Sequence, residues 1–156
     1  MRRYLLPGLC VIALVLALHT MTLASGMPGH LPLEQVAVAQ ADGEQHLFEV
    51  RLADTPAART RGLMYVTALE PGHGMLFDFG ATREVGMWMK NTPLSLDMLF
   101  IDGGGVIRRI AAKTQPFSTE IIRSGVPVRA VLEIRGGLAA ELGIEPGDRV
   151  THRIFD

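Results

Sequence analysis

Turn-forming residues divide this sequence into short runs that suit small strands and brief helices. The clearest turns are Asp42-Gly43, Pro71-Gly72-His73-Gly74, Asn91-Thr92-Pro93, Asp102-Gly103-Gly104-Gly105 and Pro146-Gly147-Asp148. Between the turns, apolar and polar residues often alternate with the period of two that is typical of half-buried β-strands. Many short strands at this spacing close into a barrel or pack as a sandwich. The spacing therefore predicts a β-rich fold.

The first half of the chain predicts a hairpin, a helix and a strand. Residues 36–52 alternate on both sides of Asp42-Gly43, a dipeptide that tolerates the positive φ angles of tight hairpin turns. Asp54 is expected to cap a short helix over residues 55–63, which ends near a glycine. A strand over residues 75–79 follows.

The second half predicts further short strands and a second helix. We expect strands at 87–90, 96–101, 106–112, 130–134 and 150–155, a helix at 137–142, and irregular chain at 113–127. The total is about eight or nine short strands with two short helices and no internal repeat. The predicted fold class is mainly β (α+β by count), as one compact barrel-like domain over residues 34–156.

The first 24 residues have the pattern of a secretory signal peptide. Two arginines precede an apolar block over residues 9–18, which is too short to span a bilayer, and Thr22-Leu23-Ala24 supplies small residues for cleavage. Cleavage after Ala24 would remove Cys10, the only cysteine; the alternative is an uncleaved N-terminal anchor. We expect a flexible leader over residues 25–33 and a periplasmic or extracellular protein.

The charge of the exported part limits its partners. Thirteen basic side chains face sixteen acidic ones, a net charge of −3, and no basic cluster is present. Nucleic acid and anionic membrane surfaces are therefore not expected partners. No membrane-spanning segment follows the signal, and a chain without cysteines must be held together by its core. We expect a soluble monomer that needs no cofactor.

Unusual polar residues gather in one stretch, Gly86 to Ile101. It contains the only tryptophan (Trp88), one of two lysines (Lys90), and a single acid (Asp97) within an apolar run. By period two, Trp88 and Lys90 point away from Met87 and Met89. The turn before Pro93 predicts a strand–turn–strand hairpin at this place.

Several separate blocks of the sequence resemble the family named domain of unknown function 192. The blocks are Arg61-Gly62-Leu63-Met64, Gly74-Met75-Leu76-Phe77, Trp88-Met89-Lys90-Asn91-Thr92, Leu96-Asp97, Phe100-Ile101-Asp102, Val131-Leu132-Glu133, Gly136 and Gly147-Asp148. They span about residues 36–155. The resemblance implies a small, often exported prokaryotic protein with a β-rich, barrel-like fold, and it implies no established activity, ligand or catalytic residue.

The sequence departs from the family pattern in two places. Many members carry proline where Ser95 stands, and here the proline is Pro93. Many members also carry cysteines in the segment equivalent to residues 114–124, where this chain has none. A redox or disulfide role proposed for such relatives therefore cannot apply to this chain.

Lys90 and Asp97 are the first candidates for a site. They flank a turn and can face each other across a hairpin, as a ligand-binding or acid–base pair in a pocket covered by Trp88. The structural alternative is a corner ion pair in which Asp97 accepts backbone amides from the Asn91-Thr92 turn. Because arginine is the usual cation of this chain, a lysine here favours the functional interpretation slightly.

The other candidates have weaker signals. Arg61 can bind an anion or complement a helix dipole, and Glu133 can face a groove or solvent. The side chains of Asn91 and Thr92 are expected to bind the turn backbone or a ligand. A set of methionines could supply thioether ligands for Cu(I) or fill gaps in the core: Met64, Met75, Met87, Met89 and Met98.

Three functions follow from these residues. The first is a non-enzymatic exported module that binds a small molecule or an envelope component through Trp88, Lys90 and Asp97. The second is an enzyme that uses Asp97 or Glu133 as acid or base with Lys90 as electrostatic partner. The third is a Cu(I)-binding or oxidant-buffering protein. The readily recognised hydrolase and zinc motifs are absent from the sequence.

Overall fold

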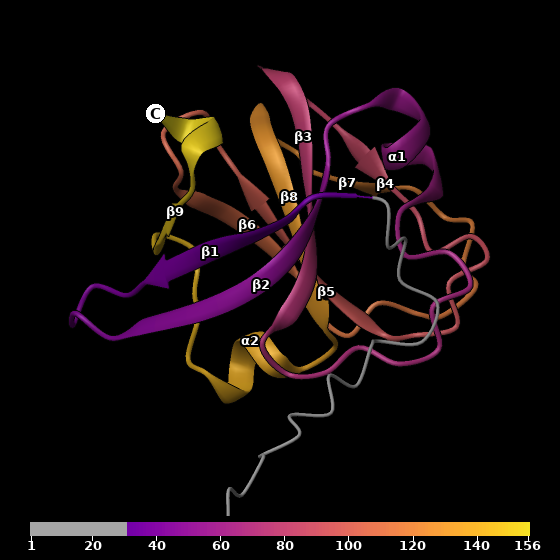
Figure 1. Cartoon of the computed structure of the whole chain (residues 1–156), viewed down its shortest axis with the longest axis horizontal. Helices are drawn as coiled ribbons and strands as arrows, with labels where there is room; N and C mark the ends of the chain where they lie inside the picture. Colours follow the sequence, from indigo (N-terminus) through magenta and orange to yellow (C-terminus); the bar gives the residue numbers. More distant parts are fainter. Residues whose placement is uncertain (1–30) are drawn as a thin grey trace, which may run out of the picture.

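The computed structural model describes residues 31–156 as a curled seven-stranded sheet, a separate two-stranded sheet and short helices (Figure 1). The strands are β1 Leu33–Ala39, β2 Gln45–Ala53, β3 His73–Arg83, β4 Gly86–Met87, β5 Leu96–Ile101, β6 Ile107–Ala111, β7 Ile122–Arg123, β8 Val128–Arg135 and β9 Arg149–Thr151. The helices are α1 Pro56–Arg61, α2 Leu138–Glu141 and the 3-10 helix η1 Arg153–Phe155. The predicted mainly β fold class is confirmed. The predicted signal peptide (residues 1–24) and all but the last residues of the predicted leader (25–33) lie outside the described residues.

The large sheet has the order β6-β5-β8-β3-β2-β1-β9 and curls into a half-barrel. All its neighbours are antiparallel except β2 and β3, which are parallel, so the chain between them must cross back along the sheet. That crossover contains α1. Backbone hydrogen bonds between Ile107 and the Gly147-Asp148 turn (2.8–2.9 Å) bring β6 close to β9 at one end. Figure 1 shows α1, β4 and β7 on the side of the molecule opposite β9 and the C-terminus.

The local elements follow from the residues expected to form them. In the first hairpin Val36 pairs with Phe48, and Gly43 supplies the turn with φ of 94°. A second hairpin, β5 with β6, forms around the glycine-rich turn that was expected at Asp102 to Gly105. The helix cap is corrected from Asp54 to Thr55, whose hydroxyl accepts the Ala58 amide at 3.1 Å.

Both faces of the middle strands are buried. Side chains alternate along β3, β5 and β8, so that Leu76, Leu99 and Leu132 enter one apolar cluster inside the curl. Met75, Phe77, Met98, Phe100 and Val131 enter a second cluster beneath α1. Strands that are buried on both faces read as continuous apolar runs, which is how residues 96–101 read in the sequence.

The predicted hairpin over Gly86 to Ile101 is wrong. β4 is only two residues long and pairs with β7, which lies in the stretch expected to be irregular. β5 instead pairs with β6 and β8. The alternation itself holds, since Met87 and Met89 are buried while Trp88 and Lys90 are exposed.

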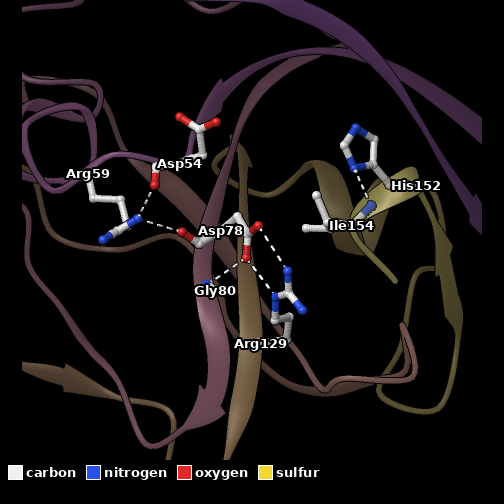
Figure 2. Close-up of polar contacts among 7 residues, drawn as sticks. All are labelled: Asp54, Arg59, Asp78, Gly80, Arg129, His152 and Ile154. Carbon is white, nitrogen blue, oxygen red and sulfur yellow. Dashed lines mark hydrogen bonds and ion pairs between the residues drawn. The ribbon is translucent and has the colours of Figure 1, made fainter. Parts of the chain in front are cut away.

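The predicted final strand over residues 150–155 is also too long. β9 ends at Thr151, and η1 follows. Nδ1 of His152 accepts the Ile154 amide at 3.4 Å, which turns the chain out of the sheet (Figure 2). Within residues 31–156, no helix is long and apolar enough to cross a membrane.

Candidate functional site

A cavity of about 310 Å³ lies between α1, the segment 86–92 and the face of the large sheet beneath α1. Its volume is at the lower end of the range for small-molecule sites. Its walls include the apolar side chains of Leu63, Phe77 and Phe79. Seven of the candidates identified in the sequence also line it: Arg61, Met64, Met87, Trp88, Lys90, Thr92 and Glu133. The fold therefore brings together candidate residues from three separate segments.

Glu133 lies at the buried end of the cavity, which we call the floor. It is 4% exposed on β8, directly opposite Met75 of β3 and Met98 of β5. Burial raises the pKa of Glu133 to about 8, and within residues 31–156 no neighbouring charge or hydrogen bond opposes that effect. A carboxyl that is buried without a partner is costly when ionised, so Glu133 carries a proton at neutral pH.

Exposed cations and an aromatic ring form the other end, which we call the mouth. Trp88 is 40% exposed, and Nζ of Lys90 lies 5.3 Å from the centroid of its ring. The guanidinium of Arg61 lies 5.0 Å from the ring centroid of Tyr65. Within residues 31–156, neither cation forms an ion pair with an acid. The mouth is therefore positively charged and free to meet an anionic group.

Arg59 fixes the helix that covers the cavity. Its Nη1 donates to the backbone oxygens of Asp54 (2.6 Å) and Asp78 (2.7 Å), and so ties α1 to β3 (Figure 2). The Asp78 carboxylate accepts two bonds from Arg129 (2.7 and 3.1 Å) and one from the Gly80 amide (2.8 Å). Burial favours a higher pKa for Asp78, but these bonds outweigh it and hold the pKa below its usual value. Arg59 lines the cavity with its guanidinium already engaged.

The loops around the mouth contain strained backbone. Three residues other than glycine have positive φ there: Tyr65 (66°), Asn91 (57°) and Phe117 (61°). The Tyr65 amide donates to the Asn91 carbonyl (2.8 Å), and the Phe117 amide donates to the Thr92 carbonyl (3.0 Å). Positive φ is uncommon for aromatic residues and clusters at ligand-binding regions. These bonds hold the segments on either side of the mouth in one arrangement.

Asp97 does not belong to the cavity. It is fully buried and accepts the backbone amides of Lys113 (2.7 Å), Gly137 (2.9 Å) and Ala139 (2.9 Å). It does accept amides, as the structural interpretation proposed, but their donors are not in the Asn91-Thr92 turn. No Lys90–Asp97 ion pair exists in the part of the chain that the structure describes.

The sheet itself separates Asp97 from Glu133. Asp97 pairs with Ile134 and faces the cluster inside the curl and α2, whereas Glu133 pairs with Met98 and faces the cluster beneath α1. Period two places neighbouring register positions on opposite faces. The two acids therefore cannot act on one ligand.

The five candidate methionines all lie on the cavity side of the sheet. Met64 and Met87 line the cavity. Met75, Met89 and Met98 are fully buried in the cluster beneath α1, and the sulfur of Met89 accepts the Thr114 hydroxyl at 3.2 Å. Asn91, which does not line the cavity, donates to the sulfur of Met64 at 3.8 Å. Within residues 31–156, no group of three His, Cys, Asp or Glu side chains is placed to hold a metal ion.

Sequence reasoning missed eight cavity residues, among them Arg59, Phe77 and Phe79. The two phenylalanines were expected on one strand face, but nothing local in the sequence places that face beneath α1. Arg59 gives a weak signal as a second arginine of the predicted helix. Its role depends on carbonyl groups of Asp54 and Asp78, and only the fold brings these together.

Comparisons with known proteins find structures of the same fold. A family model named DUF192, "Uncharacterized ACR", matches residues 37–152. A protein from Sinorhizobium meliloti 1021, described as a candidate transcription regulator, is 48% identical with a TM-score of 0.78, over 80% of this chain and 96% of that one. A protein of unknown function from Novosphingobium aromaticivorans DSM 12444 is 38% identical with a TM-score of 0.76, over 78% of this chain and 86% of that one. No curated protein matches the sequence.

Proposed function

This chain belongs to the uncharacterised DUF192 family, and we propose that it is an exported protein that binds a small organic molecule in the cavity above Glu133. The observation that carries the proposal is Glu133 itself, a buried carboxyl without a partner on the floor of an open cavity. A carboxyl whose pKa is strongly perturbed by burial and that lines a cleft is typical of functional sites. A ligand is the partner that this carboxyl lacks.

The walls and the mouth support the same proposal. Leu63 and Phe77 offer an apolar surface, and Trp88 adds a half-exposed ring beside them. Lys90 and Arg61 at the mouth provide charge for orienting a ligand. Apolar side chains beside convergent polar groups are typical of small-molecule sites.

A thermal-shift screen of residues 25–156 against small organic molecules tests the proposal. A binder at 100 times its Kd should add about 3 kcal/mol to the free energy of unfolding and raise the Tm by several degrees. Glu133→Gln and Lys90→Met should reduce that rise. Lys113→Met is the matched control, because Lys113 is the second lysine of the chain and does not line the cavity. A rise that survives both cavity variants unchanged would place the ligand elsewhere and refute the proposal.

An enzyme is the second candidate, because a carboxyl with a pKa of about 8 is suited to proton transfer near neutral pH. In that function Glu133 is the acid or base, and Lys90 is the electrostatic partner. Turnover of a molecule found in the screen, lost in Glu133→Gln while binding remains, would favour the enzyme over the binding module.

The description of the Sinorhizobium meliloti relative as a candidate regulator raises the question of nucleic acid. Residues 31–156 carry thirteen basic and sixteen acidic side chains. Proteins that bind nucleic acid usually present a basic patch or stripe. The charge balance favours a small molecule over DNA as the ligand of this chain.

A further inference from the structure

We infer that the ligand of the cavity is an amino carboxylate, with its ammonium group against Glu133 and its carboxylate at the mouth. The inference rests on the proposed function and adds the chemical class of the ligand. It follows from the positions of the charged groups that line the cavity and have no partner of opposite charge. An acid without a donor lies at the floor, and cations without an acid lie at the mouth.

The floor requires a hydrogen-bond donor or a cation. Glu133 is flanked on β3 and β5 by Met75 and Met98, whose sulfur atoms are at most weak acceptors. The charged groups that line the cavity are Arg59 and Arg61 on α1 and Lys90 after β4. Within residues 31–156, none of them forms a hydrogen bond or an ion pair with Glu133.

The mouth requires an anion. Lys90 and Arg61 have no acidic partner within residues 31–156, whereas Arg59 is bound to two backbone carbonyls. A carboxylate can meet the lysine ammonium or the fork of the arginine, and either contact is a charge-assisted hydrogen bond. The two remaining cations thus point to a carboxylate at the exposed end of the ligand.

Apolar side chains form part of the cavity wall beside its polar groups. Leu63, Phe77 and Met87 line the cavity, and they match a ligand with a short apolar spacer between its charged ends. An ω-amino carboxylate with a chain of a few methylene groups has this pattern. A simple carboxylic acid leaves Glu133 unpaired, and a simple amine leaves the mouth unmatched.

Binding of an ammonium group has a measurable consequence. In the free protein Glu133 is protonated at pH 7, because burial raises its pKa to about 8. An arriving ammonium favours the ionised carboxylate, so the carboxyl proton leaves for the buffer as the ligand binds. Each binding event at pH 7 should therefore release close to one proton.

Isothermal titration of residues 25–156 at pH 7, in phosphate and in Tris, tests the inference. The probes are ω-amino carboxylates of two to six carbons, with alkanoates and alkylamines of matched length. We expect one amino carboxylate to bind at least tenfold more tightly than its matched alkanoate and amine, with release of nearly one proton. In Glu133→Gln the tenfold preference and the proton release should both disappear, whereas Glu141→Gln, an exposed control on α2, should retain both.

Failure of the inference can be told apart from failure of the proposed function. If an alkanoate binds as tightly as the amino carboxylate and no proton is released, the ligand class is wrong but the cavity still binds a ligand. If no amino carboxylate binds, the inference is overturned as well. The proposed function falls only if the cavity variants leave every ligand found in the thermal-shift screen unaffected.

Discussion

Asp97 and Glu133 are two buried acids on neighbouring strands with opposite surroundings. Three backbone amides saturate the Asp97 carboxylate, while Glu133 has no partner among residues 31–156. Hydrogen bonds to the ionised form make burial of a carboxylate tolerable, and their absence makes it costly. The first acid therefore maintains the fold, and the second is available for a ligand.

Asp97→Asn should destabilise the protein without affecting the cavity. An amide cannot accept all three backbone N–H groups, so we expect a loss of about 2–4 kcal/mol in the free energy of unfolding. Urea denaturation measures the loss. Asp148→Asn is the matched control, because the buried Asp148 carboxylate accepts one amide, that of Glu145 at 2.8 Å, and should cost about 1 kcal/mol. Equal losses in the two variants would contradict the assigned role of Asp97.

The sequence identified both acids but could not assign their roles. Asp97 was singled out because it is the one acid in an apolar run. Its donors come from positions 113, 137 and 139, which only the sheet order brings together. Glu133 alternates with Leu132 and Ile134 in the sequence, which placed it on a different face from them but left open whether that face is solvated.

At the scale of elements, α1 covers the cavity because one arginine ties it to the sheet. Arg59 bonds to a carbonyl just before the helix and to another on β3 (Figure 2). The helix is only six residues long. A helix of that length is not stable in isolation, so these bonds and its packing hold it in place.

Arg59→Met should loosen α1 while the sheet stays intact. Loss of two partly exposed bonds should cost about 1 kcal/mol, which corresponds to about fivefold faster opening of the helix. Hydrogen exchange at the Arg59 and Gly62 amides, which bond to Thr55 and Ala58, reports this opening. Arg61→Met, which removes a cation of the same helix that makes no such bonds, is the control. Unchanged exchange in Arg59→Met would show that packing alone holds α1.

Elements built from neighbouring residues were predictable, and elements built from distant ones were not. Both hairpins formed around the expected glycine turns, since turn chemistry acts within a few residues. The hairpin expected at Gly86 to Ile101 failed because β4 pairs with β7, 37 residues away by the register of Gly86 with Arg123. The apolar run of β5 did not reveal which strands would flank it.

At the scale of the whole molecule, the cavity exists because β2 and β3 are parallel and their connection must cross over the sheet. The crossover between β2 and β3 places α1 over the face of the sheet that carries Glu133. Composition and strand spacing predicted the β-rich class, but many strand orders are compatible with the same strands. Seven cavity residues could therefore be named from the sequence, whereas the cavity itself could not.

The central claim is that Glu133 is a buried carboxyl without a partner, and the pH dependence of stability tests it directly. A raised pKa means that the folded state retains its proton above pH 4.5, where the unfolded state begins to lose one. Stability therefore falls as the pH rises toward about 8, by about 1.4 kcal/mol per pH unit in the middle of this range. Asp78 and Glu34, with lowered pKa values, lose their stabilising effect only as the pH falls through those values.

The decisive measurement is the free energy of unfolding of the unmodified protein and of Glu133→Gln, by urea denaturation from pH 5 to pH 9. Contributions from Asp78, Glu34 and all other groups are common to both proteins and cancel in the difference. We expect the unmodified protein to lose about 4 kcal/mol relative to Glu133→Gln between pH 5 and pH 8, and little more above that. A difference that stays constant across this range would show that Glu133 ionises in the folded protein as it does in the unfolded chain. That result would contradict the account.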